Sequence, residues 1–139
     1  YNRTVVTIAG SPESVLEAAF HVIKKSKELV DMRNHSGEHP RLGAVDVCPF
    51  IPLRDSTYDE CVNLANRLGE RVANDLHLPV FYYGHAAVTD ERRVLSDLRK
   101  GEYEGLESRL TDSESIHSAD NNKMAHDGNI IRLRSCQPK

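Results

Sequence analysis

The chain has 139 residues, of which 39% are apolar and 28% are charged, and its formal net charge is −3. This length fits one domain with a modest core. The acidic balance argues against a general nucleic-acid binder, because such proteins usually carry a basic excess, and no apolar run approaches the length of a membrane span.

The first predicted elements are a strand and a helix. Residues 4–9 are rich in β-branched side chains and are followed by a glycine, a pattern that predicts a strand. Ser11 is a suitable N-cap and Pro12 a suitable first helical residue. Apolar residues recur at helical spacing over 15–30, so a helix is expected there.

The middle of the chain repeats this alternation. Residues 31–43 have no apolar period and read as a loop. The apolar run 44–53 predicts a strand whose two prolines place part of it at an edge, at a bulge or beyond the sheet. Thr57 and Glu60 make a capping box that opens the next helix. The apolar stripe of this helix is expected to bury Cys61, Leu64, Ala65, Leu68, Val72 and Leu76. The later predictions are a strand over 80–83, a short helix over 90–98 and a further turn or two within 101–110.

The order β-α-β-α-β-α predicts an α/β domain with helices packed on a sheet through crossover connections. From Thr111 the composition becomes polar, and large apolar residues almost disappear. We therefore expect residues 1–110 to form the domain and residues 111–139 to be a polar, disordered tail. Ile130, Ile131 and Leu133 near the end are compatible with a weak strand or with no regular structure.

The three cysteines are spaced without any CxxC pair, which is not typical of a disulfide framework. Cys48 and Cys61 lie in apolar segments and are interpreted as small core residues. This pattern favours a reduced, cytoplasmic protein.

The loop 34–43 carries two histidines, a glutamate and an arginine between a helix and a strand. Pro40 biases His39 toward an extended backbone and so aims its side chain, and the two glycines permit positive φ or close approach to a ligand. Such loops on rigid elements often hold catalytic groups.

Three interpretations of this loop remain open on the residues alone. His35 and His39 are four apart, as in some metal sites, but the glycine between them argues against a helix, and His85 is the only candidate for a third ligand. The loop could instead be structural, with polar side chains satisfying its own backbone. Acid/base catalysis by one histidine is somewhat preferred, because an imidazole can take and return a proton near neutral pH.

The run DMRNHSGEHPRLGAVDVCPFIPL resembles the signature of the glutamate formiminotransferase family, H-x-G-E-H-P-R-[ML]-G-A-[LV]-D-V-x-P-F-x-P. The likeness continues, in order, over about residues 1–110. It includes NRTV at 2–5, the helix start at 57–61, PVFYYG at 79–84 and KGEYE at 100–104, where Lys100 stands for the usual arginine.

The resemblance implies an N-terminal subdomain of this family, with a mixed sheet and helices packed on it. It also implies transfer of a formimino group from N-formimino-L-glutamate to the co-substrate tetrahydrofolate, a step of histidine degradation that needs no metal, with His39 as the catalytic residue. From side-chain chemistry, Arg41 and Arg3 are candidates to hold substrate carboxylates. Glu38 and Gly43 complete the predicted substrate-binding set.

The family's first strand and its second subdomain, which forms the other wall of the substrate site, have no counterpart in these residues. We therefore expect a fragment that depends on the missing subdomain or on a homo-oligomer, and that binds neither nucleic acid nor a membrane. The alternative is a catalytically inactive stand-alone subdomain that binds a folate or a protein partner.

Overall fold

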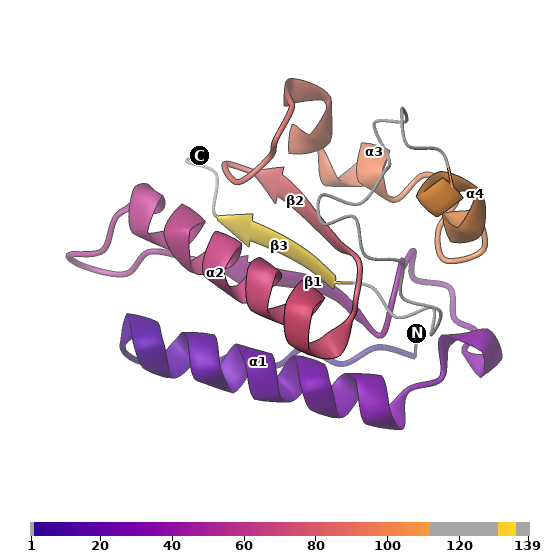
Figure 1. Cartoon of the computed structure of the whole chain (residues 1–139), viewed down its shortest axis with the longest axis horizontal. Coiled ribbons are helices and arrows are strands. Elements are labelled where there is room, and N and C mark those ends of the chain that lie inside the picture. Colours follow the sequence, from indigo (N-terminus) through magenta and orange to yellow (C-terminus); the bar gives the residue numbers. More distant parts are fainter. Residues whose placement is uncertain (1, 112–130, 136–139) are drawn as a thin grey trace.

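The computed structural model describes residues 2–111 and 131–135 as an α/β arrangement. Two long helices lie side by side over one face of a three-stranded sheet (Figure 1). The elements in chain order are α1 (Pro12–Leu29), the 3-10 turn η1 (Met32–Asn34), β1 (Val45–Phe50), α2 (Tyr58–Leu76), β2 (Val80–Gly84), the 3-10 turn η2 (Asp90–Arg93), α3 (Leu95–Leu98), α4 (Leu106–Thr111) and β3 (Ile131–Ser135).

The sheet has the order β1-β3-β2, and β3 pairs in parallel with both neighbours. Ile131 is the partner of Val45 on one side and of Val80 on the other. The three strands therefore run in one direction, and α2 is the crossover from β1 to β2 (Figure 1). The predicted mixed sheet is not what these three strands form, because both pairings of β3 are parallel.

Helix α1 begins and ends where the sequence predicts. The Ser11 side chain accepts from the Ser14 amide, and Pro12 occupies the first turn. Ion pairs from Arg67 to Glu13, at 2.7 Å, and from Arg71 to Glu17 tie α1 to α2. These surface ion pairs link the two helices, whose buried residues pack in one core.

Helix α2 confirms the predicted capping box and apolar stripe. Thr57 and Glu60 exchange side-chain and backbone hydrogen bonds at its start. Gly69, in the middle of the helix, lies against the Tyr82 ring of β2, where a Cβ would come within 2.1 Å of the tyrosine oxygen. The residues predicted to be buried are all buried: Cys61, Leu64, Ala65, Leu68, Val72 and Leu76.

The strand predicted over residues 4–9 is wrong, because the structure assigns no strand there. Val5 is 81% exposed and Val6 is 61% exposed. β-branched residues favour strands only where a neighbouring strand and a core face receive them, and the described part of the chain supplies no such neighbour. Among the described residues, α1 is accordingly the first element of regular structure.

The opposite face of the sheet is covered by the segment near α4 and by the loop before β1. Leu42, Phe81 and Leu106 form a small buried cluster there, with Tyr103 against it. Val80 and Tyr82 face the main core, so β2 alternates between the two faces as a strand must. Through Leu42, this second cluster packs the loop that carries His39 against the sheet.

Two further predictions differ in detail. The helix expected over 90–98 is divided into η2 and α3. Backbone bonds reach only three residues back within η2, as in a tighter 3-10 turn. In the expected tail, residues 131–135 form the central strand of the sheet, whereas 112–130 and 136–139 lie outside the described residues. The expected boundary at residue 110 stays a prediction.

The cysteines that the structure describes behave as core residues. Cys61 is buried, and burial raises the pKa of the Cys48 thiol to about 11, so little thiolate forms at neutral pH. Cys136 lies outside the described residues. Within the described ranges, no helix is both long enough and apolar enough to cross a membrane.

Candidate active site

The loop between α1 and β1 is held by a buried residue at each end. Met32, in η1, is 2% exposed, and Leu42 is fully buried. Asp31 caps η1 by accepting from the Arg33 amide, and the Leu42 amide donates to Asp46 at 3.0 Å. The loop segment between these two anchors is therefore fixed at both ends, which limits the positions that its polar side chains can take.

His39 is half-buried, and its ring is oriented by the backbone beside it. Its Nδ1 lies 2.8 Å from the carbonyl oxygen of Pro40. A carbonyl can only accept, so Nδ1 carries the proton in this bond, and in the neutral ring Nε2 then holds the lone pair. No residue that the structure describes bonds to Nε2. His39 thus presents a free basic nitrogen.

His35 has no such free nitrogen. Its Nε2 lies 3.2 Å from the carbonyl oxygen of Asn2, and its Nδ1 lies 3.4 Å from Nε of Arg41, which is a donor. The two partners specify the Nε2–H tautomer and leave no lone pair available. Of the two loop histidines, His39 is therefore the one equipped to act as a base, in agreement with the residue that the family resemblance implies.

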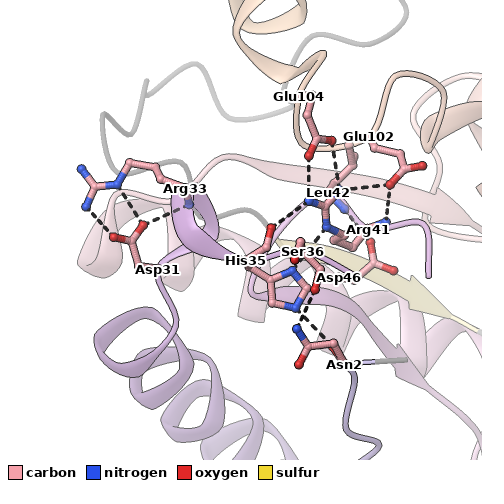
Figure 2. Close-up of polar contacts among 10 residues, drawn as sticks. All are labelled: Asn2, Asp31, Arg33, His35, Ser36, Arg41, Leu42, Asp46, Glu102 and Glu104. Atoms are coloured by element: carbon pink, nitrogen blue, oxygen red, sulfur yellow. Dashed lines mark hydrogen bonds and ion pairs between the residues drawn. The ribbon is translucent and has the colours of Figure 1, made fainter. Parts of the chain in front are cut away.

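Arg41 lies at the centre of a polar cluster (Figure 2). Its side chain is 11% exposed, and its ion pairs reach Glu102 at 3.1 Å and Glu104 at 2.7 Å. The guanidinium also donates to the carbonyl oxygen and to Nδ1 of His35. All five N–H groups have acceptors, and the carboxylates, Glu104 foremost, raise the pKa of Arg41.

The other predicted site residues are less constrained. Arg3 and Glu38 are exposed, and neither bonds to any residue in the described ranges. Arg3 follows Asn2, whose side chain donates to the Ser36 carbonyl at 2.6 Å. Gly43 is buried and is not one of the described glycines with a positive φ, so the positive φ considered for this glycine is not used.

The metal interpretation lacks support in the geometry. Among the described residues, no three histidine, cysteine or acidic side chains are grouped to hold a metal ion. His85 follows the carboxyl end of β2 and stacks on Tyr58 with ring centroids 5.1 Å apart. His39 precedes the amino end of β1, so the parallel strands separate these two histidines to opposite ends of the sheet.

Sequence reasoning assigned no role to the acidic residues of the KGEYE segment. Glu102 and Glu104 lie 61 and 63 residues beyond Arg41 in the chain. The available signal was the alternation of two carboxylates in a segment shared with the family, together with one arginine in the loop. Asp46 was also missed; it receives the Leu42 amide and an ion pair from Arg99.

The Arg41 guanidinium lowers the pKa of Glu104. The ionised carboxylate therefore stabilises the fold at pH values above its ordinary pKa of about 4.3. This stability is lost as the pH falls through the lower pKa of the folded state. We expect Glu104→Gln to flatten the loss of unfolding free energy between about pH 5 and 3, measured by urea denaturation. The difference should stay under about 1 kcal/mol, because the Glu104 side chain is 65% exposed. Glu70→Gln, at an exposed carboxylate without an ion pair in the described residues, should follow the wild type; an equal flattening there would contradict the assignment.

Comparison with known proteins agrees with the loop signature. A family model described as "Formiminotransferase domain, N-terminal subdomain" matches residues 1–130. The chain is 50% identical to formimidoyltransferase-cyclodeaminase of Mus musculus over 83% of its own length and 21% of the relative's. It is 51% identical to the Sus scrofa protein of that name over 81% of the chain and 21% of the relative.

A bacterial relative gives the same result without the cyclodeaminase name. The chain is 43% identical to glutamate formimidoyltransferase of Streptococcus pyogenes serotype M1, over 82% of the chain and 38% of that protein. It thus spans about a fifth of the animal relatives and about two-fifths of the bacterial one. The family match covers 130 of 139 residues, and the chain therefore belongs to the formiminotransferase family as its N-terminal subdomain.

Proposed function

We propose that the chain supplies the acid/base histidine of a glutamate formimidoyltransferase, and that His39 is this residue. The observation that carries the proposal is the bond from Nδ1–H to the Pro40 carbonyl at 2.8 Å. That bond leaves the lone pair of Nε2 free, while both nitrogens of His35 are engaged. A general base needs this arrangement: one nitrogen held in place and the other available.

The reaction requires one proton to move between two nitrogens. N5 of tetrahydrofolate attacks the amidine carbon of N-formimino-L-glutamate, and a tetrahedral intermediate forms. Nε2 of His39 takes the N5 proton and returns it to the glutamate nitrogen as the carbon–nitrogen bond breaks, releasing glutamate. The imidazolium that exists between these steps is stabilised by the Nδ1–H bond to the Pro40 carbonyl.

The substrate carboxylates need donors that are not already engaged. Arg3 is exposed and makes no ion pair within the described part of the chain, which supports the role predicted for it. The direct contact predicted for Arg41 stays a prediction, and it would require Arg41 to release one of its present acceptors. Glu38 and Gly43, beside these residues in the loop, remain proposed as substrate-binding groups.

The proposal concerns part of a larger site. Because the chain spans about a fifth of the animal relatives, we propose that a second subdomain or a second copy supplies the opposite wall, since proximity needs both walls. Tetrahydrofolate is the proposed co-substrate, no metal is required, and the setting is cytoplasmic, without nucleic acid or membrane. The short span of the chain also supports the alternative function, in which the subdomain binds a folate or a protein partner without turnover.

Incubation of the 139-residue protein with tetrahydrofolate and N-formimino-L-glutamate tests the proposal directly. We expect absorbance of the formimino-tetrahydrofolate product, from the chain alone or with the part of the Streptococcus pyogenes relative that lies outside the match added as a separate polypeptide. Isothermal titration with tetrahydrofolate separates the alternatives. Binding without turnover in both preparations would favour the inactive subdomain. The absence of both binding and turnover would refute the proposal.

A further inference from the structure

We infer that Glu102 is a positioning residue for His39, acting through the peptide group between Pro40 and Arg41. The carbonyl of this peptide receives Nδ1–H of His39 at 2.8 Å, and its N–H donates to Oε2 of Glu102 at 3.4 Å. One rigid plane therefore connects the carboxylate to the imidazole. The catalytic meaning of this inference rests on the proposed function, whereas the geometry stands by itself.

The carboxylate that holds this peptide is itself fixed. Oε2 of Glu102 also receives Nη1 of Arg41 at 3.1 Å, so the backbone and the side chain of Arg41 converge on one oxygen. Figure 2 shows this convergence, with Glu102 beside the backbone of Arg41 and Leu42. Rotating the peptide would break both the bond to Glu102 and the bond to His39, because its N–H and carbonyl point in opposite directions.

The backbone conformation of Glu102 indicates that the surrounding contacts hold this residue in one specific place. Glu102 has a φ of 50° and follows Gly101, with a φ of 81°. A left-handed backbone is unfavourable for glutamate and usually persists only where surrounding contacts require it. The Glu102 amide donates to the Arg99 carbonyl at 2.9 Å, and Arg99 is paired with Asp46. The turn is thus tied to the start of β1 as well as to the loop.

Glu104 offers a matched comparison on the same segment. It pairs with Arg41 through both carboxylate oxygens, at 2.7 Å and 3.0 Å, and has no bond to the Arg41 amide. Its loss should weaken the Arg41 cluster without freeing the peptide that faces His39. Only Glu102 should therefore control which nitrogen of His39 carries the proton.

The experiment reads the tautomer of His39, which does not require turnover. Long-range ¹H–¹⁵N spectra of the ¹⁵N-labelled 139-residue chain are recorded at mildly alkaline pH, where imidazoles are neutral. The signals of His39 are assigned by their loss in His39→Gln. The wild type should show the Nδ1–H form. Glu102→Gly, which removes the carboxylate and relaxes the left-handed backbone, should give a mixture of both tautomers. Glu102→Gln keeps an acceptor oxygen and should restore the wild-type pattern.

Two results would overturn the inference. One is an unchanged Nδ1–H form in Glu102→Gly, which would mean that the peptide needs no carboxylate. The other is an equal change in Glu104→Ala, which would assign the effect to the Arg41 cluster as a whole. If Glu102→Gly does not fold, Glu102→Asn gives the same readout, because asparagine tolerates this backbone and is too short to replace the contact. If only the proposed function fails, turnover is absent while the spectra of the wild type and of the Glu102 variants still differ as expected above.

Discussion

Replacing His39 by alanine is expected to lower the rate of formimino transfer by about 10²–10⁴-fold, because a positioned general acid/base contributes that much. The loss should fall on kcat, with little change in KM, since the imidazole acts on protons that move in the transition state. The measurement is the product absorbance assay at saturating substrates. Added imidazole should restore part of the rate, because the variant leaves space where the ring was.

His85→Ala is the matched control for this result. It also removes an imidazole, but from the opposite end of the sheet, where the ring stacks on Tyr58. Its turnover should match the wild type. Turnover in His39→Ala equal to that of the wild type would reject His39 as the base, and a comparable loss in His85→Ala would show that the assay reports stability instead of chemistry.

Replacing Gly69 by alanine is expected to destabilise the protein by about 2 kcal/mol, even though alanine is the better helix former. The new Cβ would lie 2.1 Å from the Tyr82 oxygen and 2.7 Å from its Cζ, both inside contact distance. Tyr82 is only 8% exposed, so its ring has little room to retreat. Thermal unfolding followed by circular dichroism should show a midpoint lower by roughly 6 °C.

Gly10→Ala provides the comparison for a glycine outside the core. A Cβ there would lie 3.6 Å from the nearest atom, which is ordinary contact, so the midpoint should barely move. Combining Gly69→Ala with Tyr82→Phe removes the nearest clashing atom but leaves the ring, and should recover part of the loss. If Gly69→Ala melts at or above the wild-type midpoint, α2 does not pack on Tyr82 as described.

Local signals predicted the helices well. Ser11 and Pro12 mark the start of α1, and the Thr57–Glu60 box marks the start of α2, because each cap satisfies backbone donors within a few residues. Strands were less predictable. Residues 4–9 had the composition of a strand and form none, whereas 131–135 had a weak signal and form the central strand. A strand depends on partners that its own residues do not specify.

The sequence by itself determined the family, the two helices of the main core and the loop with His39, since these depend on local spacing and on a long specific motif. Only the tertiary structure decided which histidine keeps a free nitrogen, and that Arg41 is engaged by Glu102 and Glu104 from more than 60 residues away. The reason is physical. A histidine tautomer and the partners of an arginine are set by atoms brought together through folding, and no short stretch of chain contains them.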